Sequence, residues 1–96
     1  MTLAELRRTL QEHAEDLRAL HVESLAAFGS VARGDAREDS DIDLLIEFDE
    51  PVGLFHFSRV KRRLEEILKR RVDLVTRGAL HPALRDRILG ESVRAS

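Results

Sequence analysis

The chain of 96 residues contains no cysteine, tryptophan or tyrosine, and it has only two prolines. Without cysteine it forms neither a disulfide framework nor a thiolate metal site. No apolar stretch is long enough to cross a bilayer and no leader-like segment is visible, so we expect a cytoplasmic protein without membrane contact. The missing tyrosine and tryptophan also leave few aromatic rings on which unpaired bases could stack.

An excess of charge of one sign is also absent. Sixteen lysines and arginines stand against 18 aspartates and glutamates, which gives a net charge of -2. This balance offers no general attraction to nucleic acid or to an acidic membrane. Apolar residues make up 43% of the chain and charged residues 35%, which is typical of a folded domain with a densely charged surface. The length predicts a single domain over residues 1–96 with a thin core.

Apolar residues recur at helical spacing in three segments. A helix over residues 3–20 is expected after the capping pattern of Thr2 and Glu5. A second helix begins near Leu54 and continues to Leu68. A third begins at Pro82, and its expected apolar side consists of Leu84, Ile88, Leu89 and Val93.

Three shorter segments alternate as strands do, over residues 22–28, 41–48 and 72–75. In the second, one face carries Ile42, Leu44, Ile46 and Phe48, and the other carries Asp41, Asp43, Leu45 and Glu47. Residues 30–40 are too polar for a core segment and are expected to form a helical turn and a loop. The order of elements predicts an α+β fold, one small sheet with helices packed against it.

The clearest chemical pattern is the pair Asp41 and Asp43. Residues two apart on a strand share a face, so both carboxylates can hold one ion. Hard cations such as Mg²⁺ prefer carboxylate and phosphate oxygens, which suits a magnesium ion that carries a nucleoside triphosphate. Asp73 lies on another strand that could bring a third carboxylate to the same place and complete a two-metal site.

A phosphate-binding turn is expected just before this pair. Gly29 ends the first strand and lets the backbone approach a phosphate closely, while Ser30 offers a hydroxyl and an N–H group. We therefore predict that Gly29 and Ser30 bind the triphosphate and that the aspartates bind its metal.

The text GSVARGDAREDSDIDLLIEF, followed about thirty residues later by Asp73, resembles the signature of the polymerase-beta-like nucleotidyltransferase superfamily. Together with the later segment HPALRDRILGESV it is similar to the minimal nucleotidyltransferase branch, over nearly the whole chain. The resemblance implies a palm-like fold with a mixed sheet. It also implies that Gly29 and Ser30 bind phosphate, that Asp41 and Asp43 bind metal, and that Asp73 binds metal and activates the attacking hydroxyl. Arg33, in the matching A-R-G extension, is expected to contact a phosphate.

Members of this branch are similar to antitoxins that act on HEPN-domain ribonuclease toxins. The resemblance implies a Mg²⁺-dependent enzyme, with two ions, that moves AMP from ATP to a toxin tyrosine. A chain used up by its catalytic sheet has no second domain to hold an acceptor, which favours a protein partner. A homo-oligomer stays open as well.

Other interpretations of the same residues also stand. Alternating acids are often only a solvated strand face, and that reading predicts a loss of stability when Asp43 is replaced. The protein could be a non-catalytic antitoxin that neutralises its partner by binding, or a transferase acting on a small-molecule hydroxyl.

Two further groups of residues are assigned to the surface. The four histidines, His13, His21, His56 and His81, include no pair at the i, i+4 spacing of a helical metal site. The basic residues at positions 61–63 and 69–71 are interrupted by Glu65 and Glu66, so we expect a solvated helix face rather than an RNA-binding stripe. Arg70 and Arg71 remain candidates for partner docking near the expected site.

Overall fold

The protein, described over all 96 residues by a computed structural model, is built on a four-stranded sheet. Its strands are β1 (Val22–Phe28), β2 (Ile42–Phe48), β3 (Val72–Thr76) and β4 (Val93–Arg94), in the order β3-β2-β1-β4. β2 runs parallel to β3, whereas β1 is antiparallel to both β2 and β4. The sheet is therefore mixed, and the predicted α+β class is confirmed.

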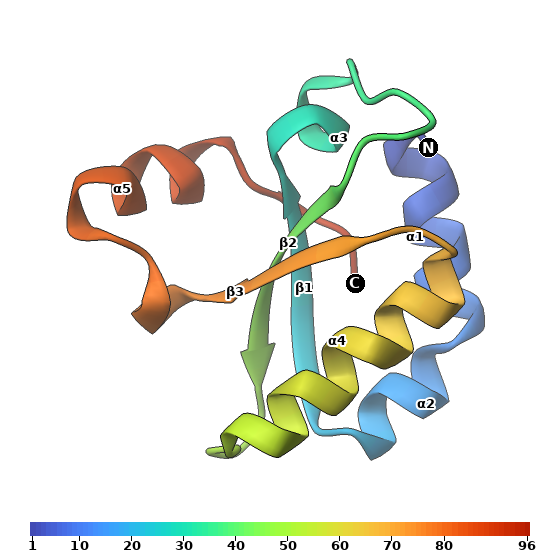
Figure 1. Ribbon diagram of the computed structural model, residues 1–96, viewed down its shortest axis with the longest axis vertical. Coiled ribbons are helices and arrows are strands. Elements are labelled where there is room, and N and C mark those ends of the chain that lie inside the picture. The colour runs from blue at the N-terminus through green and yellow to red at the C-terminus, as the bar shows by residue number, and fades with distance from the viewer.

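Three helices cover one face of the sheet: α1 (Leu3–Glu12), α2 (Ala14–Ala19) and α4 (Leu54–Leu68). Figure 1 shows α4 lying across the strands, with α1 and α2 beside it. The sheet contributes alternate side chains to the shared core, and the buried positions are Leu25, Ala27, Ile42, Leu44, Ile46, Val72 and Leu74. The helices supply the leucines and other apolar residues of their inward faces, which are Leu6, Leu10, Leu17, Val60, Leu64, Ile67 and Leu68. The alternation in β2 that the sequence predicts is the one that fills this core.

The first helical segment differs from the prediction. Residues 3–20 form two helices rather than one, because the chain leaves helical geometry at His13, where φ is -113° and ψ is 22°. The ring of His13 bonds the carbonyl of Thr9 at that point. The predicted start is confirmed, since the Thr2 hydroxyl accepts the N–H of Glu5 at 3.1 Å. The same hydroxyl bonds the Glu5 carboxylate at 3.2 Å, so the two side chains stabilise each other.

The connection between β1 and β2 carries a short helix, α3 (Gly29–Arg33). Gly34 ends it in the left-handed conformation, with φ of 82°, and an exposed loop leads on to β2. Phe28 at the end of β1 is paired with Asp43 near the start of β2. The helical turn and loop predicted for residues 30–40 are thus present, at the same end of the sheet as the first residues of β2.

The last segment also differs from the prediction. After β3 come a 3-10 turn, η1 (Arg77–Ala79), and then α5 (Pro82–Glu91), which begins at Pro82 as expected. The expected apolar side of α5 is not core, because no residue of this helix is buried and Leu84 is 48% exposed. Val93 belongs to β4 instead of the helix. In Figure 1, α5 stands apart from α1, α2 and α4.

β4 joins the end of the chain to its beginning. Val93 and Arg94 pair with β1, and the backbone groups of Ala95 and Ser96 bond Leu25. The guanidinium of Arg7 on α1 donates twice to the carbonyl of Arg94, at 2.9 and 3.0 Å. No helix of the protein is both long and apolar enough to cross a membrane.

Candidate active site

Three acidic residues meet at the end of the sheet where β2 and β3 begin. Asp43 and Asp73 are direct partners across the parallel strands, and Asp41 immediately precedes β2. The neighbours Ile42, Leu44, Val72 and Leu74 are all buried in the helix-covered core. By the alternation of a strand, Asp43 and Asp73 therefore leave the opposite face together. The structure thus brings together the acids that the sequence singled out.

The charges in this cluster act on one another. Burial and the neighbouring carboxylates of Asp73 and Asp41 raise the pKa of Asp43, and the Arg33 guanidinium offsets this in part. Asp43 is half-buried, whereas Asp41 and Asp73 are exposed. Three carboxylates so close together repel one another when no metal ion is bound.

Gly29 lies directly against this cluster. Its φ is 66°, a left-handed conformation that favours glycine, and a Cβ atom at this position would collide with the carboxylate of Asp43. The pairing of Phe28 with Asp43 explains the contact, because it brings the residue after Phe28 over the acid. The backbone at Gly29 therefore lies so close to the carboxylate of Asp43 that no side chain fits between them.

Ser30 and Arg33 follow on the short helix α3. The carbonyl of Ser30 accepts the N–H of Asp35 at 3.0 Å, and its hydroxyl forms no hydrogen bond with the protein. The Arg33 side chain is half exposed and lies 3.4 Å from the carboxylate of Asp35. Its effect on the pKa of Asp43 shows that its charge reaches the acidic cluster. The Ser30 hydroxyl and the Arg33 guanidinium are thus both on α3, the helix that follows Gly29 and was expected to contact a triphosphate.

Arg71 also lies beside the acidic cluster. From the sequence this residue is only a candidate for partner docking, without a chemical role. Its Nε atom lies 3.3 Å from Oδ1 of Asp41, and its side chain is largely exposed. Arg71 directly precedes β3, and its carbonyl accepts the N–H of Ile42. The sequence shows three consecutive basic residues, 69–71, before the third strand. It does not indicate which of the three side chains would lie against Asp41.

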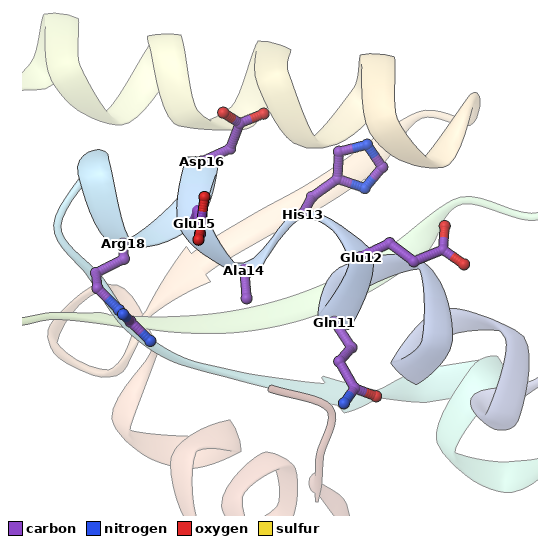
Figure 2. Close-up of a pocket in the computed structure, with 7 residues that line it drawn as sticks. All are labelled: Gln11, Glu12, His13, Ala14, Glu15, Asp16 and Arg18. Atoms are coloured by element: carbon purple, nitrogen blue, oxygen red, sulfur yellow. The ribbon is translucent and has the colours of Figure 1, made fainter.

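The surface hollows reach only the margin of the acidic cluster, where a small one of about 140 Å³ is lined by Asp41 and Arg71. The largest, about 540 Å³, is at the break between α1 and α2 and is lined by mostly polar side chains. Figure 2 shows His13 and Asp16 pointing toward α4, and Gln11 and Arg18 pointing away from it. No strand residue lines this hollow, and none of the four hollows is lined by Asp43 or Asp73. The acidic cluster is thus an open surface site, and we place the chemistry there because of its charges and not because of its volume.

A second titratable cluster stands at the opposite end of β1 and β2. The ring nitrogens of His21 lie 3.1 Å from Asp49 and 3.2 Å from Glu50. The three side chains could together hold a metal ion. A search for histidines at the i, i+4 spacing misses this group, because its members come from two separate turns. Both ring nitrogens already face carboxylates and all three side chains are exposed, so the expected surface histidine agrees with the structure.

The acidic cluster has the donors that a hard divalent cation prefers. It offers carboxylate oxygens only, with no nitrogen or sulfur ligand, as magnesium sites do. Burial and the neighbouring carboxylates raise the pKa of Asp43, and a bound cation would favour its ionised form. Asp41, Asp43 and Asp73 would hold such an ion, which would supply neutralisation of a phosphate's charge.

The open acidic cluster beside a glycine turn suits a protein that binds a metal-bound phosphate. The family model of the nucleotidyltransferase domain matches residues 10–95, and the chain belongs to this family, in its minimal nucleotidyltransferase branch. The resemblance inferred from the sequence is therefore confirmed.

Three known proteins show the relationship. The protein adenylyltransferase MntA of Thermococcus cleftensis is 38% identical over 94 residues, which cover 97% of this chain and 95% of that protein. A solved structure described as a minimal nucleotidyltransferase has a TM-score of 0.81 at 41% identity, covering 97% of this chain and 95% of that one. The structure of a tri-AMPylated Shewanella oneidensis HEPN toxin with its MNT antitoxin matches with a TM-score of 0.67 at 16% identity, covering 95% of this chain and 71% of that chain, and shows a shared fold.

Proposed function

We propose that the protein transfers AMP from ATP, with Mg²⁺, to a tyrosine hydroxyl of a HEPN-type ribonuclease toxin and thereby acts as its antitoxin. The observation that carries the proposal is the meeting of Gly29, Asp43 and Asp73 at one end of the sheet. The similarity to an adenylyltransferase over nearly the whole chain supports AMP as the transferred group. The shared fold with a HEPN-bound MNT antitoxin supports the class of partner.

Each residue has a part in the proposed reaction. The tyrosine oxygen attacks the α-phosphorus of ATP, a new O–P bond forms, and the bond to the β,γ-pyrophosphate breaks, so that pyrophosphate leaves. Asp73 accepts the proton of the tyrosine, because it is exposed to an incoming acceptor while it stands beside Asp43. Asp41, Asp43 and Asp73 would hold Mg²⁺, which would neutralise charge on the phosphates.

The phosphates are held on the other side of the cluster. Gly29 lets the chain approach them, the Ser30 hydroxyl donates to a phosphate oxygen, and Arg33 balances their charge. The only hollow lined by an acid of the cluster is the small one of about 140 Å³ at Asp41, which supports an acceptor that brings its own binding surface. A protein tyrosine fits that condition better than a small molecule, which would need an enclosing pocket.

The test uses ATP labelled at either the α- or the γ-phosphate, Mg²⁺, and a HEPN-domain toxin as the acceptor protein. We expect α-label on the HEPN protein, no γ-label, and loss of transfer with EDTA or with Asp43→Asn. Transfer that persists in Asp43→Asn would contradict the proposed site. Neutralisation of the toxin by a variant that transfers no label would instead identify a binding antitoxin.

A further inference from the structure

The most exposed apolar side chains of the molecule lie toward the end of β3 that is farther from Asp73. Leu54 and Phe55, at the start of α4, are 76% and 89% exposed. Next to them is a hollow of about 450 Å³, which we call the edge groove; it is lined by Leu54, Phe57, Leu74, Val75, Thr76 and Ala79, with two loop residues before α4. Six of its eight lining residues are apolar, in a chain whose surface is otherwise densely charged. Neighbouring apolar groups of this kind usually mark a contact surface.

One wall of the edge groove is the free side of β3. This strand lies at the end of the sheet and pairs only with β2. The carbonyl of Arg71 bonds Ile42 on β2, whereas the N–H of Val72 turns away from the sheet and bonds the Glu65 carboxylate at 3.1 Å. Because the direction alternates along a strand, Leu74 and Thr76 also direct main-chain groups away from β2. An edge of this kind can pair with another extended chain.

The groove and the acidic cluster are parts of one strand. Asp73 is followed directly by Leu74, Val75 and Thr76, which line the groove. Val75 also leaves the same face of the sheet as Asp73, since two residues separate them. A segment bound along this edge would place its own neighbouring residue beside Asp73.

We propose that the edge groove binds an extended segment of the acceptor protein, which adds a strand to β3 and seats a large apolar side chain against Leu54 and Phe57. This inference rests on the proposed function and names the surface that presents the acceptor hydroxyl. Main-chain bonds to Leu74 and Thr76 hold the segment whatever its sequence, and the apolar hollow selects among segments. β3 thereby positions the acceptor, and the same strand carries Asp73, which takes the proton of the acceptor hydroxyl.

Two variants test the groove in different ways. Leu54→Glu puts a charge into the hollow from an exposed position. Thr76→Pro removes one outward N–H from the edge; the φ of Thr76 is -97°, in the extended region near that of proline, and the residue before it is in a strand. The matched control is Leu84→Glu, an equally drastic change at an exposed leucine of α5 outside the groove.

The measurement is calorimetric titration of each variant with the HEPN-domain protein, without nucleotide, after thermal melting has shown that the variants fold. We expect Leu54→Glu to raise the dissociation constant by about 10-fold or more and Thr76→Pro to raise it by about 5-fold. The dissociation constant of Leu84→Glu should stay within about 2-fold of that of the parent protein. In hydrogen exchange, the amides of Leu74 and Thr76 should gain protection in the complex.

Unchanged affinity in both groove variants, or no gain in protection, would overturn the inference. So would a failure of the unmodified chain to bind the HEPN protein, or an isolated chain that is a dimer dispersed by Leu54→Glu, since a second copy would then fill the groove. Failure of the proposed function looks different, because it appears as the absence of α-label on the HEPN protein whatever the state of the groove.

Discussion

Asp43 on β2 and Asp73 on β3 are direct partners across two parallel strands, so two carboxylates share one face at the same level of the sheet. Burial, together with the neighbouring carboxylates of Asp73 and Asp41, raises the pKa of Asp43 above its usual value of 3.8. The arrangement is costly for folding and useful for binding a cation, and it makes the two roles of the acids separable by experiment.

Asp43→Asn should leave the metal-free protein as stable as the parent or more stable, and transfer should fall by about 100-fold or more. Below pH 3.8 Asp43 is protonated in both the folded and the unfolded chain, so the parent and the variant should be alike. As the pH rises, only the folded state resists ionisation, and the parent loses stability relative to the variant. Melting temperatures from pH 3 to 7 measure this difference. Glu23→Gln, at an exposed carboxylate of β1, is the control. A destabilised Asn variant would indicate a structural role for Asp43.

Gly29→Ala should lower the free energy of unfolding by about 1–2 kcal/mol, because a Cβ is strained in the left-handed region. It should also abolish transfer, since the new methyl group displaces the carboxylate of Asp43. Gly34→Ala is a matched control, with φ of 82° and open space around its Cα. It should show a similar loss of stability while it keeps activity. Urea unfolding and the label assay compare the two, and equal activity losses would argue against the contact with Asp43.

Arg71→Ala should tighten the binding of Mn²⁺, used as a spectroscopic substitute for Mg²⁺, because Arg71 competes for Oδ1 of Asp41. Exposed ion pairs contribute up to about 1 kcal/mol, so the gain should be at most about 5-fold. Electron paramagnetic resonance of free Mn²⁺ during a titration measures it. Arg77→Ala breaks the ion pair with Glu47 at 2.9 Å and should not change Mn²⁺ affinity. Weaker Mn²⁺ binding in Arg71→Ala would refute the competition.

Glu65→Ala should destabilise the protein by about 0.5–1.5 kcal/mol, because the N–H of Val72 loses its only side-chain partner. This bond fixes the start of β3, so its loss should leave Asp73 less firmly held. The variant should therefore also transfer AMP more slowly. Denaturant titration and initial rates measure the two effects. Glu66→Ala removes an exposed carboxylate paired with Arg63 and should change both much less.

β1, β2, β3 and α4 could be predicted because each depends on local periodicity. The buried alternation in β2 left only one register in which Ile42, Leu44 and Ile46 face the helices, and this fixed where Asp43 points. The position of Asp73 on the third strand, and then the family resemblance, singled it out as the third carboxylate, but its pairing with Asp43 joins distant segments and is seen only in the structure.

Other features depend on contacts between distant segments. β4 has two residues, too few for a pattern of alternation, and it exists because β1 pairs with it. The break at His13 falls where no glycine or proline marks it. The apolar residues of α5 have helical spacing, but the core is already filled by α1, α2 and α4, so that helix stays outside it. A spacing of apolar residues predicts a helix, but it does not predict which surface the helix will cover.

The two bonds from Arg7 to the carbonyl of Arg94 have a consequence for folding. They join α1 to β4 across a sequence separation of 87 residues. Contacts between such distant segments form slowly, so we expect the closure of β4 onto β1 and α1 to be a late step in folding.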